Sequence, residues 1–139
     1  MEICVTSEAI ETVRAQERAA HPHECCGLLL GEVSSDVWAA VGRITRAVPT
    51  ANVHARPATG FEIDPQALID AHRAQREGGP RLLGYYHSHP TGDPRPSVID
   101  AANAPGDGMI WAICAAGDVQ FWRDTPAGFK ALSCSHGDR

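Results

Sequence analysis

The chain lacks the features that would place it in a membrane or on a nucleic acid. No apolar run in its 139 residues approaches the roughly 18 residues that a membrane-spanning helix needs. The N-terminus has no basic region followed by an apolar core, which is the pattern of a secretory signal. The net charge is −5 and no basic block is present, which argues against nucleic acid and anionic membranes as main partners. These absences predict a cytoplasmic protein whose partner has a weakly positive surface.

The cysteines do not form a pattern typical of disulfides or of a thiol metal site. There are five, an odd number, and no C-x-x-C pair occurs. We therefore expect reduced thiols, several of them buried. A catalytic cysteine is the alternative, but it would need a histidine from a distant segment. The five positions are Cys4, Cys25, Cys26, Cys114 and Cys134.

The length and composition are those of one globular domain. The hydrophobic fraction is 43% and the charged fraction is 21%. We expect residues 1–132 to form this domain and residues 133–139 to be a disordered tail. Expected strands alternate with expected helices, which predicts an α/β layered domain with a mixed sheet. The expected strands are 2–5, 25–32, 37–48, 61–63, 82–89, 109–116, 119–123 and 129–132, and the expected helices are 8–20, 65–77 and 97–104.

The run at residues 82–100 carries the strongest chemical signal, and reads LLGYYHSHPTGDPRPSVID. Its first five residues are apolar or aromatic apart from one glycine, which is typical of a buried strand. If the strand continues through His89, its period of two places His87 and His89 on the same face. Ser88 then faces away. Two imidazoles on one face can bind one ion.

The segment after this strand can bring a carboxylate to the imidazole pair. Three prolines and a glycine within residues 90–96 end the strand, and Ser97 reads as the start of a helix. Ser97 and Asp100 are three residues apart and share a helix face. Two histidines and an aspartate form a three-ligand zinc site with one position open for water, which then becomes acidic enough to attack a carbonyl. The alternative is a solvated turn with incidental histidines.

The spacing of these residues also resembles a known family. The pattern H-x-H, seven residues, S, two residues, D is similar to the signature of the JAMM/MPN+ (Mov34/MPN/PAD-1) metallopeptidases. That family places a glutamate far upstream, and Glu24 in HECCGLLLGE matches it. The resemblance runs from about Met1 to about Phe129. By itself Glu24 reads equally well as an exposed residue at the start of a strand.

The resemblance implies a fold, a metal and a role for each residue. It implies a three-layer α-β-α sandwich similar to cytidine deaminases, and one zinc ion per chain held by His87, His89 and Asp100. Glu24 would transfer the proton of the attacking water, and Ser97 would donate a hydrogen bond to the oxyanion. Ser97 also reads as a plain helix N-cap. A deaminase is set aside because H-x-E with P-C-x-x-C is absent.

The substrate implied by the resemblance is a ubiquitin-like protein. Small members of this size are similar to prokaryotic enzymes that trim residues after the C-terminal Gly-Gly of a sulfur-carrier protein, and this is our leading hypothesis. The alternatives are a deisopeptidase acting on protein conjugates and a metal-free MPN scaffold that only binds partners. The sequence does not indicate an oligomeric state.

The segment at residues 49–60 shows no periodicity and is expected to be a surface loop. Asn52 and His54 lie within it and could line a substrate groove. Solvated loop residues are the simpler interpretation, and we expect that for both.

Overall fold

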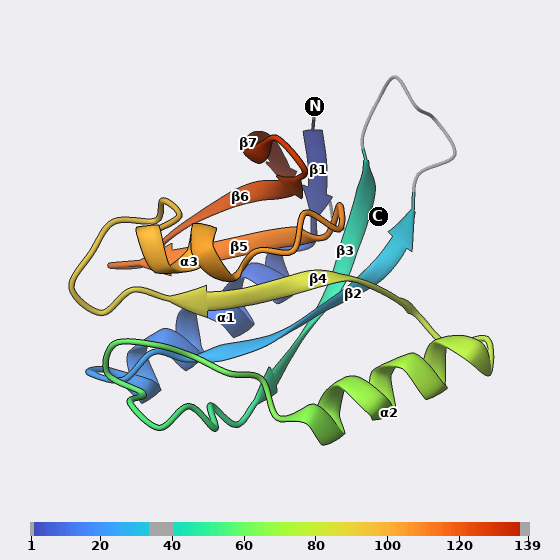
Figure 1. Cartoon of the computed structure of the whole chain (residues 1–139). Helices are drawn as coiled ribbons and strands as arrows, with labels where there is room; N and C mark the ends of the chain where they lie inside the picture. The colour runs from blue at the N-terminus through green and yellow to red at the C-terminus, as the bar shows by residue number, and fades with distance from the viewer. Residues whose placement is uncertain (1, 34–40, 137–139) are drawn as a thin grey trace.

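The computed structural model describes residues 2–33 and 41–136. Seven strands and three helices alternate along these residues (Figure 1). Their bounds are β1 (Glu2–Val5), α1 (Ser7–Ala20), β2 (Cys26–Val33), β3 (Gly42–Thr50), α2 (Pro65–Arg76), β4 (Arg81–Ser88), α3 (Val98–Asn103), β5 (Ile110–Ala115), β6 (Asp118–Thr125) and β7 (Gly128–His136).

The sheet is mixed, as expected, but it closes on itself. The strand order is β1-β3-β2-β4-β5-β6-β7, and β1 also pairs with β7, so the strands form a closed barrel. The β1–β3, β1–β7 and β4–β5 pairs are parallel, and the others are antiparallel. The expected α-β-α sandwich is therefore correct in its mixed sheet and flanking helices, but its middle layer is a curled sheet without free edges. The twist of the strands brings the two edges together.

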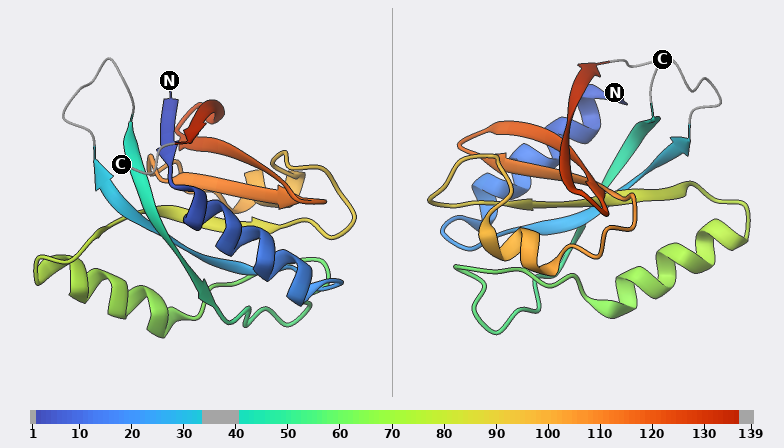
Figure 2. Two further views of the ribbon diagram at one scale, coloured as in Figure 1. Left: turned by 180° about the vertical axis from the view of Figure 1, so that it is seen from behind. Right: turned by 45° about the horizontal axis from the view of Figure 1, so that its top comes forward.

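One core lies between α1 and the sheet (Figure 2). Helix α1 begins after Thr6, whose side chain accepts a hydrogen bond from the main-chain N–H of Ala9 at 3.2 Å. Threonine is one of the residue types that favour this position. The buried side of α1 places Ala9, Ile10 and Val13 against the strands.

A second, smaller core lies on the other face of β2 and β4, where α2 packs. Asp64 caps this helix by accepting from the N–H of Gln66 at 3.0 Å, and Pro65 occupies its first turn. No residue of α2 is fully buried. The helix covers the sheet through partly buried side chains at Ala67, Leu68 and Ala71.

Two sequence expectations differ from the structure, and part of a third lies outside the described residues. Residues 61–63 form only an isolated bridge between Ile63 and Asn52, because the neighbouring chain passes as a loop. Residues 133–136, expected in the tail, belong to β7 and pair in parallel with β1. Residues 37–40 of an expected strand lie outside the described residues, and that strand is seen as β3 from Gly42.

The fold places β4 between β2 and β5, so its carboxyl end is bordered by both neighbours. Gly27 of β2 lies against the ring of the fully buried Tyr86 on β4, in space that a side chain at residue 27 would occupy. The absence of a side chain at residue 27 leaves room for this ring beside His87, which is opposite Cys26. Within the described residues, no helix is long and apolar enough to cross a membrane.

Candidate metal centre

The two histidines of the H-x-H motif lie at the end of β4 with their side chains on the same side. His87 is on the strand and 1% exposed, and His89 follows it. Their Nε2 atoms are 3.1 Å apart. Ser88 faces the other way, and its hydroxyl accepts the main-chain N–H of Cys25 at 2.9 Å. The alternation predicted from the sequence is confirmed.

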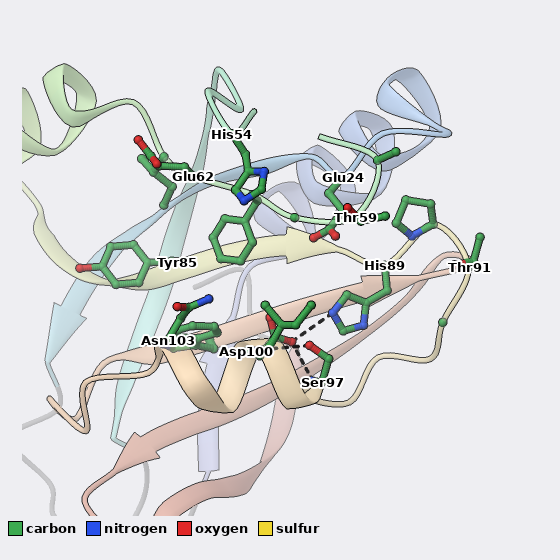
Figure 3. Close-up of a pocket in the computed structure, with 18 of the residues that line it drawn as sticks. Glu24, His54, Thr59, Glu62, Tyr85, His89, Thr91, Ser97, Asp100 and Asn103 are labelled. Carbon is green, nitrogen blue, oxygen red and sulfur yellow. Dashed lines mark hydrogen bonds and ion pairs between the residues drawn. The ribbon is translucent and has the colours of Figure 1, made fainter. Parts of the chain in front are cut away.

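Helix α3 brings Asp100 to the imidazole of His89 (Figure 3) and to that of His87. One carboxylate oxygen lies 3.1 Å from Nε2 of His87 and the other 3.1 Å from Nε2 of His89. Asp100 and Ser97 form a capping box, in which each side chain accepts the main-chain N–H of the other residue, at 2.9 and 3.0 Å. The helix start therefore fixes the direction of the carboxylate.

The donor set fits a divalent metal ion. Nδ1 of His89 lies 2.7 Å from the carbonyl oxygen of Asp93 and donates its proton there, which leaves a lone pair on Nε2. In a neutral His89 that lone pair faces the carboxylate of Asp100, so two acceptors point at each other. The three ligand atoms lie within 4.8 Å of one another. Zinc bonds of about 2.0–2.1 Å place tetrahedral ligand atoms about 3.3 Å apart, which matches this arrangement.

The protonation of Asp100 and His87 suits a cation. Burial lowers the pKa of His87, and the hydrogen bond to Asp100 only partly opposes it. Burial also acts to lower the pKa of His89, but its hydrogen bonds to Asp100 and to the Asp93 carbonyl outweigh burial and raise it. Burial acts to raise the pKa of Asp100, but the hydrogen bonds from both histidines hold that pKa well below its usual range. Asp100 is therefore ionised and His87 neutral at neutral pH, as metal ligands must be.

Glu24 lies at the same centre from a different part of the chain. It lies two residues before the start of β2, is 8% exposed and lines the same groove as His89 and Asp100 (Figure 3). Burial raises its pKa to about 7, with the charge of His89 opposing and that of Asp100 adding to the effect. The alternative interpretation of Glu24, an exposed residue at a strand start, is therefore wrong. A carboxyl with such a pKa can both accept and release a proton near neutral pH.

Ser97 can combine the two roles that its position suggests. Its hydroxyl oxygen accepts the main-chain N–H of Asp100 at 3.0 Å, which uses a lone pair. A serine hydroxyl also has one O–H to donate. Ser97 lines the groove, so this proton can reach a bound group while the cap stays intact.

Aromatic rings support the centre from behind. Phe61 stacks on His87 with ring centroids 4.2 Å apart and an angle of 16°. The edge of Trp111 meets the same imidazole at 5.8 Å. Nδ1 of His87 is buried and has no hydrogen-bond partner among the described residues. The sequence predicts strands at both positions and gives no sign that either ring lies at the site.

A groove of about 750 Å³ leads away from the centre. Figure 3 shows His89, Glu24 and Ser97 at one end, and Tyr85 and Asn103 at the other. Within the described part of the chain, no lysine or arginine lines it, whereas four carboxylates do. The groove therefore suits an extended segment that is neutral or positively charged. The carboxylates are those of Glu24, Glu62, Asp100 and Asp107.

Asn52 and His54 were expected to be solvated loop residues, and this is wrong. Both are half-buried, His54 lines the groove, and Asn52 makes four hydrogen bonds to the main chain. No spacing rule applies inside an irregular loop, so the sequence contained no signal for either.

The cysteines take no part in the groove. Burial raises the pKa of Cys25 to about 11 and also raises the pKa of Cys26. Neither residue lines the groove, although both follow Glu24 in the chain. All five cysteines are free thiols, as expected. A catalytic cysteine beside Glu24 is therefore not supported, because the reactive form is the thiolate.

The fold and the centre together define a hydrolase of the JAMM type. The family model for prokaryotic homologues of the JAB domain matches residues 6–125, and the chain belongs to that family. Over 103 residues it is 36% identical to a desampylase of Haloferax volcanii, covering 73% of this chain and 70% of the relative. It is 37% identical over 95 residues to a probable TtuB-protein conjugate cleaving protease of Thermus thermophilus, covering 68% of this chain and 58% of the relative. A CysO-cysteine peptidase of Mycobacterium tuberculosis is 28% identical over 98 residues, which is 70% of this chain and 62% of the relative.

Solved structures agree with this assignment of the fold. The solution structure of protein DSY2949 from Desulfitobacterium hafniense has a TM-score of 0.82 at 26% identity and covers 99% of this chain and 94% of its own. The crystal structure of a JAB1/MPN domain protein from Archaeoglobus fulgidus has a TM-score of 0.56 at 19% identity, with 96% and 98% covered. The second likeness shows the fold alone, and that fold is MPN.

Proposed function

We propose that this protein is a zinc-dependent peptidase or isopeptidase that cleaves the amide bond after the C-terminal residues of a ubiquitin-like sulfur-carrier protein in the cytoplasm. The observation that carries the proposal is the convergence of His87, His89 and Asp100 within 4.8 Å. Glu24, 8% exposed beside them, supplies the group for proton transfer.

Each residue has one task in the proposed reaction. His87, His89 and Asp100 hold the metal, which, when bound, makes a water molecule acidic enough to attack a carbonyl. Glu24 accepts a proton from the attacking water and passes it to the nitrogen of the leaving amine when the C–N bond breaks. Ser97 donates its O–H to the carbonyl oxygen as negative charge develops there.

The groove supports an extended tail as substrate. Gly60 and Gly92 are among its lining residues, and neither presents a side chain to a bound segment. The absence of lysine and arginine from the described lining removes the partners that an acidic tail would need. A small-residue tail ending in Gly-Gly is compatible with both features.

The names of the relatives favour two forms of this substrate. The desampylase and the conjugate-cleaving protease are named for removal of a carrier from another protein, which breaks an isopeptide bond. The CysO-cysteine peptidase is named for a residue joined to a carrier, which corresponds to trimming. Both reactions break an amide bond at the carboxyl end of a carrier, so one site can serve both.

Intact-mass analysis of two carrier substrates tests the proposal. One substrate ends in Gly-Gly followed by one or two extra residues, and the other is joined through Gly-Gly to a lysine side chain. We expect loss of the added mass from at least one of them with zinc present and no loss with chelator. No cleavage of either substrate by zinc-loaded protein would contradict the proposal.

The Glu24→Gln variant is the matched control for the same assay. It keeps the size of the side chain and the three ligands, and removes the group that takes the proton. We expect it to bind zinc as the wild type does and to lose turnover by roughly 100-fold or more. Normal turnover in this variant would contradict the role given to Glu24. A metal-free scaffold would instead show no bound zinc.

A further inference from the structure

The side chain of Asn52 makes four hydrogen bonds, which connect Glu24 to residues of the loop that lines the groove. Its amide nitrogen donates to the carbonyl oxygens of Glu24 at 2.9 Å and Gly60 at 3.0 Å. Its amide oxygen accepts the N–H of His54 at 3.1 Å and of Glu62 at 3.0 Å. Two donors and two lone pairs are the full capacity of a primary amide. The pattern also fixes which atom is nitrogen, because two carbonyls face one atom and two N–H groups face the other.

The main chain of Glu24 depends on this loop for its position. Glu24 precedes the first residue of β2, and so lies outside the hydrogen-bond ladder of the sheet. Its N–H donates to the carbonyl of Pro57 at 2.7 Å and its carbonyl accepts from Asn52. Both main-chain groups of the proton-transfer residue are therefore held by residues 52–57. Of these two contacts, the one from Asn52 is made by a side chain, and the one from Pro57 is made by the main chain.

The same four hydrogen bonds connect Glu24 to one wall of the groove, which is formed by His54, Gly60 and Glu62. His54, Gly60 and Glu62 all line the groove, and all three are bonded to Asn52 through their main chains. A second main-chain bond, from Val53 to the Glu62 carbonyl at 2.9 Å, closes the loop beside it. The wall keeps main-chain bonds of its own, such as Gly60 N–H to the Arg56 carbonyl at 3.0 Å, whereas the Glu24 carbonyl is held by Asn52, so a change at Asn52 falls mainly on Glu24.

We infer that Asn52 is a positioning residue for Glu24, holding the proton-transfer carboxylate at its working distance from the substrate carbonyl. This inference rests on the proposed function. It requires an amide at residue 52, because no other side chain of this size supplies two donors and an acceptor. Aspartate has the same shape but would present oxygen to the carbonyls of Glu24 and Gly60, where two acceptors repel.

Kinetics of an Asn52→Asp variant test the inference. A misplacement of about 1 Å costs up to roughly 100-fold in rate, so we expect kcat to fall about 10- to 100-fold. We expect KM to change by less than about 3-fold and zinc affinity to stay as in the wild type, since Asn52 contacts none of the three ligands. Asn52→Ala, which adds no charge, is the second variant. Val53→Ala is the control, because it alters an exposed side chain of the same loop.

Amide hydrogen exchange at Glu24, followed by NMR, gives a readout that needs no substrate. In Asn52→Asp and Asn52→Ala we expect the Glu24 N–H to exchange faster than in the wild type and in Val53→Ala. Unchanged exchange at Glu24, or a loss that falls on KM or on zinc binding, would overturn the inference. If the wild type cleaves neither carrier, the proposed function fails, and the exchange measurement still decides whether Asn52 holds Glu24.

Discussion

Nε2 of His87 and Nε2 of His89 lie 3.1 Å apart, although His89 already gives its other ring proton to the carbonyl of Asp93. Neutral His89 therefore turns a lone pair toward His87 and toward the carboxylate of Asp100. The lone pair of neutral His89 and the carboxylate of Asp100 repel each other, so a positive charge between them stabilises the pair. A proton on His89 provides it without metal, consistent with its raised pKa, and a divalent cation provides it better.

Replacement of one imidazole tests this arrangement directly. We expect His89→Ala to weaken zinc binding by more than about 100-fold, above the 10- to 100-fold typical of residues that only support a ligand. The measurement is competition with a chromophoric chelator. His72→Ala, which removes an exposed histidine on α2, is the control and should leave affinity unchanged. Equal affinity in both variants would mean that the ion binds elsewhere.

The metal-free protein should lose stability with rising pH because of Glu24. Its pKa in the folded chain is about 7, above the ordinary value of 4.5, so the folded state binds this proton more tightly than the unfolded state. The stability contributed by that proton is complete below about pH 4.5 and is lost as the pH rises through about 7.

Urea unfolding of wild type and Glu24→Gln in chelator, from pH 4.5 to 8, measures this effect. As the pH rises, we expect the wild type to lose unfolding free energy relative to Glu24→Gln. The reason is that glutamine carries no charge to bury. Glu8→Gln on α1 is the exposed control. A constant difference across the range would show that Glu24 titrates in the folded protein as it does in the unfolded chain.

Ser97 offers a way to separate a structural role from a chemical one. Glycine at an N-cap costs only a few tenths of a kcal/mol, whereas alanine costs about 1 kcal/mol. Both remove the O–H that would reach the oxyanion. We therefore expect Ser97→Gly and Ser97→Ala to lose kcat similarly, by roughly 100- to 1,000-fold, while only Ser97→Ala lowers the melting temperature clearly. Loss of kcat that follows melting temperature would assign Ser97 to the cap alone.

The parts of this site that the sequence predicted are those set by local geometry. Strand alternation puts His87 and His89 together, and the three-residue spacing of Ser97 and Asp100 forms a capping box. Both relations hold whatever the rest of the chain does. The role of Glu24 is predicted only through its family position, because a residue that precedes a strand has no periodicity to reveal its burial.

The parts that the sequence did not predict depend on contacts between distant segments. Closure of the barrel is decided where β7 meets β1, more than 120 residues away along the chain. The role of Asn52 depends on where the carbonyl of Glu24 lies, 28 residues earlier. Loop residues of this kind look solvated in a sequence because nothing local shows their partners.

We expect Phe61 to contribute to metal binding although it is not itself a ligand. His87 has no hydrogen-bond partner for Nδ1 among the described residues, so packing orients its ring, and Phe61 stacks on it at 4.2 Å. Supporting residues of metal ligands contribute about 10- to 100-fold in affinity, and we expect Phe61→Leu to lose about 10-fold in zinc affinity while Phe61→Tyr retains it.

Phe129→Leu is the matched control for this change. Phe129 is also half-buried and also packs against Trp111, with centroids 5.0 Å apart, but it makes no ring contact with His87 among the described residues. Both variants lose a comparable apolar surface, so both should lower the melting temperature, whereas only Phe61→Leu should weaken zinc binding. Equal losses of affinity would show that general loosening of the aromatic cluster, and not the stack on His87, determines how firmly the ion is held.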